Sequence, residues 1–156
     1  MFYASDDLPV PPVPQNPAEG LSAQATNAMS PLEFENLARR VLSDHFSTGL
    51  SRDQIRGVSK TFDFVSADGR LVGDAKYFTL VRGVSLPPAK FSVIAEHVWL
   101  LEKTGAAKTF LVFGNERMVP TQWLKRYGNL VSKVEFYFLT NSGELETLSV
   151  DQTPGD

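Results

Sequence analysis

Apolar residues recur at helical spacing in two long segments of this 156-residue chain and form short runs elsewhere. The first helical segment follows Ser30-Pro31-Leu32-Glu33, a capping-box pattern with proline at the first helical position, and continues to about residue 46. The second covers residues 89–104, and Gly105 favours an end to that helix. The remaining pattern predicts a short helix at 121–127 and strands at 53–59, 60–65, 70–78, 108–113, 133–139 and 144–150.

The predicted order is helix, three strands, helix and strand, followed by a further helix and two strands. Because consecutive elements usually pack beside one another, this order predicts one α/β domain over residues 30–150 with a mixed central sheet flanked by helices. Residues 1–29 contain five closely spaced prolines and predict a flexible arm. Residues 151–156 are expected to form a disordered tail.

Asp68-Gly69 is the most informative turn signal, because glycine accepts the positive φ that two-residue hairpin turns require. A turn at these residues pairs Val65 with Val72 and Asp63 with Asp74. The Cβ atoms of directly opposed residues are only about 4.5–5.5 Å apart, and like charges so placed are destabilising. Two opposed aspartates therefore indicate a cation nearby.

Lys76 belongs to the same group of side chains. Because the side chains of a strand alternate between its two faces, Asp63, Asp74 and Lys76 are predicted to project from one face. Hard divalent cations prefer oxygen ligands, so the three residues predict a metal site with an ammonium group beside it. The alternative to a metal site is a hairpin without function at this point, in which the two aspartates are solvated or form ion pairs with Lys76.

Charge is distributed unevenly along the chain. The net charge is −3, yet all fifteen lysines and arginines lie between Arg39 and Lys133, and residues 30–133 have a net charge of +5. Such a basic central region is compatible with a polyanionic partner. The absence of cysteine excludes disulfides and thiol catalysis. No apolar run approaches the roughly 20 residues of a membrane helix and no secretory signal opens the chain, so we expect no membrane partner and a cytoplasmic location.

The spacing of Asp63, Asp74 and Lys76 resembles the motif of the PD-(D/E)xK nuclease superfamily, in which an aspartate precedes a (D/E)-x-K element on a hairpin. The segment Phe34-Glu35-Asn36-Leu37-Ala38 resembles the Phe-Glu-x-x-Ala sequence on the first helix of Mrr-like members. The order of elements is similar as well. The resemblance covers about residues 30–115.

This resemblance implies a restriction-endonuclease-like fold with an αβββαβ core, to which the last helix and two strands form an extension. It implies a catalytic set of Glu35, Asp63, Asp74 and Lys76. Mg²⁺, for which Mn²⁺ substitutes, would be held by Asp63, Asp74 and the carbonyl oxygen of Ala75. Lys76 would hold the attacking water or neutralise developing charge.

The pattern leaves open which glutamate of the first helix faces the site. Glu33 and Glu35 flank the apolar stripe at similar angles; Glu33 has a task in the capping box, and Glu35 matches the family position. His97 is expected to be an ordinary partly buried or surface histidine. Five basic residues are predicted to contact phosphates and so position DNA without reading its sequence: Arg52, Arg56, Lys60, Arg82 and Lys90.

These features predict a metal-dependent endonuclease that hydrolyses DNA, in a restriction, repair or mobile-element setting. Its specificity would come from loops, a partner protein or a homodimer. The alternative is a catalytically silent nuclease-fold module that binds DNA or protein, and the complete set of four residues favours the enzyme. A third interpretation, hydrolysis of a small phosphate ester, lacks a phosphate-binding glycine loop in the sequence.

Overall fold

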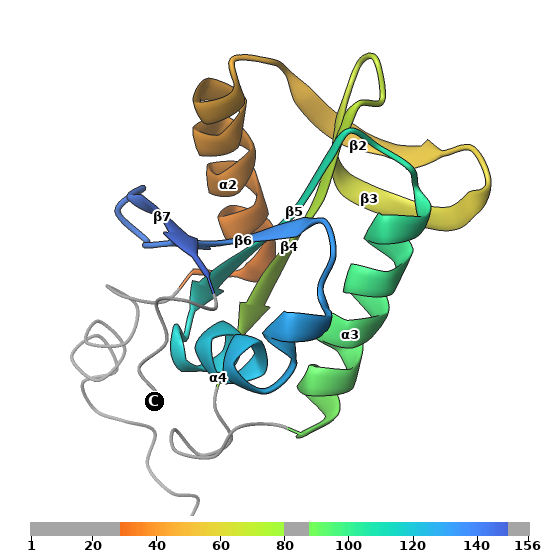
Figure 1. Ribbon diagram of the computed structural model, residues 1–156. Coiled ribbons are helices and arrows are strands. Elements are labelled where there is room, and N and C mark those ends of the chain that lie inside the picture. Colours follow the sequence, from red (N-terminus) through yellow and green to blue (C-terminus); the bar gives the residue numbers. More distant parts are fainter. Residues whose placement is uncertain (1–28, 80–87, 150–156) are drawn as a thin grey trace, which may run out of the picture.

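The computed structural model describes residues 29–79 and 88–149 (Figure 1). The described elements follow the predicted order of helices and strands. Apart from Met29, the predicted arm lies outside the described residues, as does the predicted tail. The elements are α2 (Pro31–Phe46), β2 (Leu50–Ile55), β3 (Val58–Ser66), β4 (Leu71–Phe78), α3 (Pro88–Lys103), β5 (Lys108–Asn115), α4 (Met118–Tyr127), η1 (Gly128–Leu130), β6 (Val134–Leu139) and β7 (Leu145–Leu148).

The six strands form one sheet in the order β2-β3-β4-β5-β6-β7. The central strands β4, β5 and β6 run parallel, whereas the outer neighbours pair antiparallel. Helix α2 covers one face of the sheet, and α3 and α4 cover the other (Figure 1). The predicted α/β class, with a mixed sheet flanked by helices, is confirmed.

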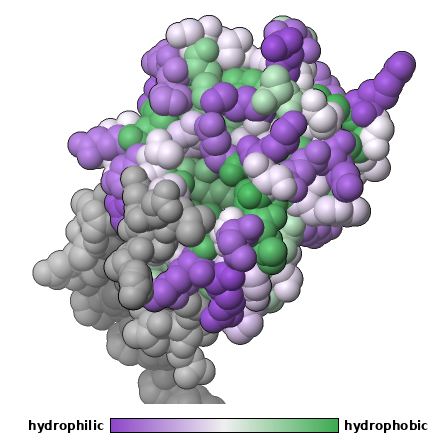
Figure 2. All heavy atoms as spheres, in the orientation of Figure 1, coloured by the Kyte–Doolittle hydropathy of each residue, from purple (hydrophilic) through white to green (hydrophobic). Residues whose placement is uncertain are grey.

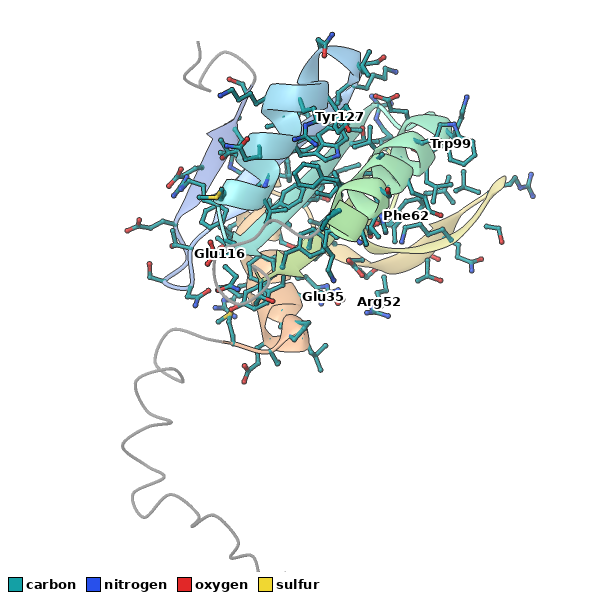
Figure 3. All side chains as sticks on the ribbon, turned by 90° about the horizontal axis from the view of Figure 1, so that it is seen from below. Glu35, Arg52, Phe62, Trp99, Glu116 and Tyr127 are labelled. Carbon is teal, nitrogen blue, oxygen red and sulfur yellow. The ribbon has the colours of Figure 1, made fainter. Side chains whose placement is uncertain are left out.

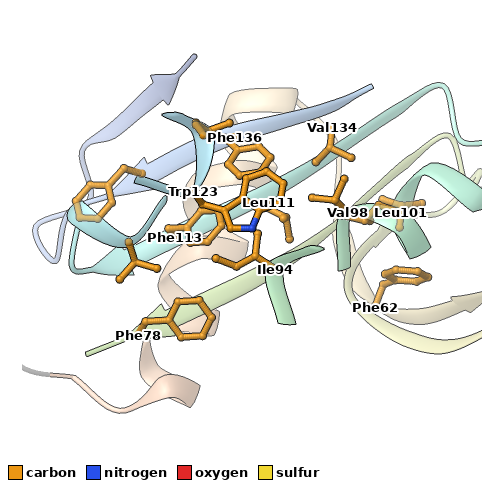
Figure 4. Close-up of a cluster of buried hydrophobic side chains, with 14 of the residues drawn as sticks. Phe62, Phe78, Ile94, Val98, Leu101, Leu111, Phe113, Trp123, Val134 and Phe136 are labelled. Carbon is orange, nitrogen blue, oxygen red and sulfur yellow. The ribbon is translucent and has the colours of Figure 1, made fainter. Parts of the chain in front are cut away.

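The hydrophobic core consists of two clusters, one on each face of the sheet. Under α2, the buried residues Phe34, Ala38 and Leu42 pack against Phe64 and Phe110. The larger cluster lies under α3 and α4 (Figure 4) and includes Phe62, Ile94, Val98, Leu101, Leu111, Phe113, Trp123 and Phe136. Both clusters include residues of β3 and β4, so these strands lie packed between the helices.

The surface carries a few large apolar side chains outside these clusters. Viewed as in Figure 1, apolar residues gather towards the middle of the face and polar residues surround them (Figure 2). Among the described residues, the exposed large hydrophobic side chains are Leu32, Trp99, Met118 and Leu130. Within the described ranges, no helix has the length and hydropathy needed to cross a bilayer.

The predicted capping box at the start of α2 is confirmed. Ser30 Oγ accepts a hydrogen bond from the Glu33 N–H (3.0 Å), and Glu33 Oε1 accepts one from the Ser30 N–H (2.8 Å). Ser30→Ala is therefore expected to lower the free energy of unfolding by about 1 kcal/mol, measured by urea denaturation. The control Ser92→Ala, at an exposed position within α3, should cause no such loss. An equal loss in both variants would contradict a capping role for Ser30.

The boundary between the first two predicted strands is wrong. β2 ends at Ile55 and β3 begins at Val58, so the chain reverses at Arg56-Gly57 instead of continuing as a strand to residue 59. Gly57 has a φ of +92°, which residues with a side chain rarely adopt. Ile55 and Val58 face each other across this tight turn.

The second hairpin has the predicted register but a wider turn. Val65 lies opposite Val72, as expected. The loop includes residues 67–70 rather than two residues, and the Gly69 N–H donates to the Ser66 carbonyl oxygen over 2.9 Å. Gly69 has the positive φ, +73°, that its position in the turn requires.

Candidate functional site

Asp63 and Asp74 lie where the regular pairing of β3 with β4 ends, one residue beyond the pair Phe64–Gly73. Here side chains take the place of backbone partners. The Asp63 N–H donates to Asp74 Oδ1 (2.8 Å), and the Ala75 N–H donates to Asp63 Oδ2 (2.9 Å). Each carboxylate is therefore fixed by the strand opposite it.

Gly73 allows this part of β4 to lie directly against the core. A Cβ atom at this position would lie 2.3–2.5 Å from atoms of the buried Phe110 ring, far below a normal contact. Only glycine fits between the ring and the strand. Asp74 therefore follows a backbone position that core packing holds in place.

Asp74 is the most deeply buried charged residue of the site, with 1% of its side chain exposed. Its Oδ2 atom is buried and accepts no hydrogen bond. The ammonium nitrogen of Lys60 lies 3.1 Å away, at ion-pair distance, and also donates a hydrogen bond to the carbonyl oxygen of Thr61. Lys60, predicted to contact DNA, thus lies against a carboxylate of the site.

Asp63 is also largely buried, with 20% of its side chain exposed. Burial and the nearby charge of Asp74 raise the pKa of Asp63 to about 6, and the hydrogen bond from the Ala75 N–H opposes that rise. Asp63 Oδ1 lies 3.8 Å from the Arg52 guanidinium. The charge of Asp74 therefore disfavours ionisation of Asp63, which is the repulsion between like charges that the sequence predicts for this pair.

Helix α2 brings Glu35 to the site, while Glu33 remains in the capping box. Arg52 donates two hydrogen bonds to Glu35 (3.0 and 3.1 Å), and the two residues lie together in Figure 3. Arg39 donates to Glu35 (2.8 Å) and to the Asp63 carbonyl oxygen (3.0 Å), which ties α2 to β3. The hydrogen bonds from Arg52 are the main reason that the pKa of Glu35 is lowered, against the opposing effect of burial.

Lys76 and His97 form the side of the site nearest α3. Lys76 Nζ lies 2.8 Å from His97 Nε2, and His97 Nδ1 lies 2.8 Å from the carbonyl oxygen of Val93. Burial lowers the pKa of Lys76, although the charge of Asp74 opposes this shift. Burial and the Lys76 charge lower the pKa of His97. His97 is partly buried as expected, but its place at the site was not predicted.

Of the other predicted phosphate contacts, Arg56 and Lys90 lie away from the carboxylates of the site. Arg56 is exposed in the turn between β2 and β3. Lys90 is exposed on α3, with its ammonium 5.2 Å from the centre of the Phe78 ring. Among the described residues, neither forms an ion pair with a carboxylate of the site. Arg82 lies outside the described residues.

The donor set suits a cation that needs few protein ligands. Across the described residues, no three acidic, histidine or cysteine side chains converge as a metal-binding group. Both oxygens of Glu35 accept hydrogen bonds from arginines, which leaves Asp63 and Asp74 as the candidate ligands. Mg²⁺ is commonly held by one or two carboxylates together with phosphate oxygens and water. The buried Asp74 Oδ2, which lacks a hydrogen bond, fits that requirement once a cation takes the place of the Lys60 ammonium that lies 3.1 Å from it.

The site thus gathers charged side chains from five elements at one point of the sheet. It holds the carboxylates of Glu35, Asp63 and Asp74 and the basic side chains of Arg39, Arg52, Lys60, Lys76 and His97. Comparisons of the chain with protein-family models, curated proteins and solved structures give no match.

Proposed function

We propose that the protein is a Mg²⁺-dependent endonuclease that hydrolyses DNA phosphodiester bonds, with the restriction-endonuclease-like fold of the PD-(D/E)xK superfamily. The succession α2, β2, β3, β4, α3, β5 supports the proposal, because it has the order of the αβββαβ core. One observation carries the chemistry: the buried Asp74 Oδ2 accepts no hydrogen bond and has the Lys60 ammonium at ion-pair distance (3.1 Å), while Oδ1 accepts a hydrogen bond from the Asp63 N–H. The half-buried Lys76 follows two residues later on the same strand.

The side chains of the site would divide the work. Asp63 and Asp74, with the carbonyl oxygen of Ala75, would hold Mg²⁺ or Mn²⁺. The bound ion would polarise a phosphoryl oxygen and make a bound water more acidic. Lys76 would donate hydrogen bonds to the attacking water or to the charge that develops on phosphate.

Two basic residues of the β2–β3 hairpin, Arg52 and Lys60, would contact the DNA backbone. Arg52 is 58% exposed at its side chain, so part of its guanidinium can reach a phosphate while Glu35 holds it in place. Lys60 lies at ion-pair distance from Asp74 and would exchange that carboxylate for a phosphate oxygen. Such contacts position DNA without selecting a sequence, so a loop, a partner protein or a second copy would supply specificity.

The purified chain is expected to nick or cut DNA in Mg²⁺ or Mn²⁺ and to lose this activity in EDTA. The assay uses supercoiled, linear duplex, single-stranded and branched DNA, with gel analysis of the products. Isothermal titration calorimetry with Mn²⁺ measures metal binding separately. The absence of cleavage on all four substrates, together with no metal binding, would refute the proposed function.

A second function is favoured by the balance of charge at the site. Every carboxylate already has a basic partner: Arg39 and Arg52 at Glu35, Arg52 near Asp63, and Lys60 at Asp74. A site neutralised in this way is compatible with a nuclease-fold module that binds DNA without cutting it. DNA binding that is equally tight with and without Mg²⁺, and is never followed by cleavage, would favour this candidate.

A further inference from the structure

His97 is joined to Lys76 through a chain of two hydrogen bonds that begins within helix α3. Its Nδ1 lies 2.8 Å from the Val93 carbonyl oxygen, which can only accept. The proton must therefore be on Nδ1, and the neutral ring then has a lone pair on Nε2. That atom lies 2.8 Å from Lys76 Nζ and accepts a hydrogen bond from the ammonium.

This arrangement limits where the ammonium of Lys76 can be. A lysine side chain has a long flexible stem and three rotatable donors, so its charge is poorly fixed unless an acceptor holds it. The imidazole is a rigid acceptor that is itself fixed to the helix backbone, and its side chain is only 14% exposed. Its Nε2 atom also lies 3.7 Å from Asp74 Oδ2, so the same ring atom is close to both the ammonium and the buried carboxylate.

We propose that His97 is a positioning residue, which holds the Lys76 ammonium beside the Asp63–Asp74 carboxylates through the hydrogen bond that His97 Nε2 accepts. The role in cleavage rests on the proposed function, whereas the hydrogen bond can be tested without it. An acceptor of fixed direction is what the geometry requires. A glutamine at position 97 offers an oxygen at similar reach, whereas alanine offers none.

The kinetic test compares His97→Ala and His97→Gln with the wild-type chain. His97→Ala is expected to lower the single-turnover cleavage rate at saturating DNA by about 10–100-fold, with DNA affinity little changed, because a catalytic group misplaced by about 1 Å has an effect of this size. His97→Gln should recover most of the rate. Thermal melting of both variants establishes that they fold. His45→Gln changes the other histidine of the chain, which is exposed and packs beside Phe46 and Tyr137, and should cleave as the wild type does.

The spectroscopic test needs no cleavage. With two histidines in the chain, ¹⁵N–¹H correlation spectra of the rings are assigned with the His45→Gln variant. We expect His97 to be the Nδ1–H tautomer, and we expect Lys76→Met to shift its Nε2 resonance while leaving His45 unchanged. An Nε2–H tautomer, or an Nε2 resonance that does not respond to Lys76→Met, would overturn the inference.

The two tests separate the failure of this inference from that of the proposed function. A folded His97→Ala variant that cleaves at the wild-type rate overturns the positioning role and leaves the nuclease proposal standing. A glutamine variant no better than alanine also overturns it, since the acceptor would then not matter. If the wild type neither cleaves DNA nor binds Mn²⁺, the nuclease proposal fails, and the ring spectra still determine whether His97 holds Lys76.

Discussion

Asp74→Asn is expected to lower Mg²⁺-dependent DNA cleavage by about 10³-fold or more, because a metal-held charge contributes several kcal/mol and each 1.36 kcal/mol is tenfold in rate. The asparagine keeps an oxygen that can accept the Asp63 N–H, as Asp74 Oδ1 does over 2.8 Å in the wild type. What it loses is the charge on the buried Oδ2 atom. The fold should therefore persist while the proposed metal site is lost.

Single-turnover cleavage and calorimetric Mn²⁺ binding measure the two consequences separately. Asp44→Asn is the matched control, because Asp44 is an exposed carboxylate near the end of α2. It should leave cleavage and metal binding unchanged. Asp74→Ala is a poorer variant, since the loss of the acceptor for the Asp63 N–H destabilises the fold by about 1–3 kcal/mol. Cleavage by Asp74→Asn within tenfold of the wild type would refute a role for Asp74 as a metal ligand.

The register of the acidic hairpin could be predicted because it depends on local turn chemistry. Gly69 adopts a positive φ, and this conformation brings Val65 opposite Val72 even though the turn is wider than two residues. Continuing this register predicts Asp63 opposite Asp74. The backbone pairing of the two strands in fact ends at Phe64–Gly73, and the aspartates are joined by the hydrogen bond from the Asp63 N–H to Asp74 Oδ1. The capping box at Ser30 was predictable for the same reason, since all its atoms lie within four residues.

The boundary between β2 and β3 was harder to place, because β2 is an edge strand whose residues are mostly exposed. An exposed strand has no buried side to produce an alternating pattern. Gly57 was the available signal, since it follows Arg56 between the apolar residues Ile55 and Val58. A glycine so placed favours a turn in which only glycine adopts the required φ readily.

The basic side chains of the site depend on tertiary packing, and the sequence says little about them. The ion pair between Arg39 and Glu35 could have been predicted from the sequence, because the two residues are four apart on a helix, the spacing of helical ion pairs. The sequence predicts that Arg52 and Lys60 contact DNA, whereas their pairing with Glu35 and Asp74 depends on how the β2–β3 hairpin folds beside α2 and β4. His97 lies on a helix remote in sequence from the motif, and no local spacing connects it to Lys76.

Asp63→Asn is expected to stabilise the metal-free protein at pH 7.5 by about 3 kcal/mol, because a pKa raised from 3.8 to about 6 corresponds to a penalty of that order on the ionised side chain. The sign follows from proton binding. Between pH 4 and 6, Asp63 is protonated in the folded chain but loses its proton in the unfolded chain, so its effect on stability becomes more unfavourable as the pH rises. Above about pH 6 the full penalty applies, and below about pH 4 there is none.

Urea denaturation in EDTA at pH 4.5 and pH 7.5 measures this difference. The gain from Asp63→Asn should be small at the lower pH and near its maximum at the higher one. Asp68→Asn is the matched control, because hydrogen bonds from the Arg70 N–H and the Ser66 hydroxyl lower the pKa of Asp68, so its removal should bring no gain at pH 7.5. A variant Asp63→Asn that is less stable than the wild type at pH 7.5 would show that the contacts of Asp63 with Ala75 and Arg52 outweigh its burial.

Adding Mg²⁺ should reverse the order of stability of the wild type and the Asp63→Asn variant, so that the wild type becomes the more stable. A ligand that binds only the folded wild type stabilises it by about 4.1 kcal/mol at 1,000 times its dissociation constant, which exceeds the gain of about 3 kcal/mol from Asp63→Asn, and the variant should gain much less from Mg²⁺. The burial and like charge that raise the pKa of Asp63 without metal are the conditions under which a divalent cation is most favourable there. A wild-type gain in Mg²⁺ that Asp63→Asn fully shares would place the metal elsewhere on the protein.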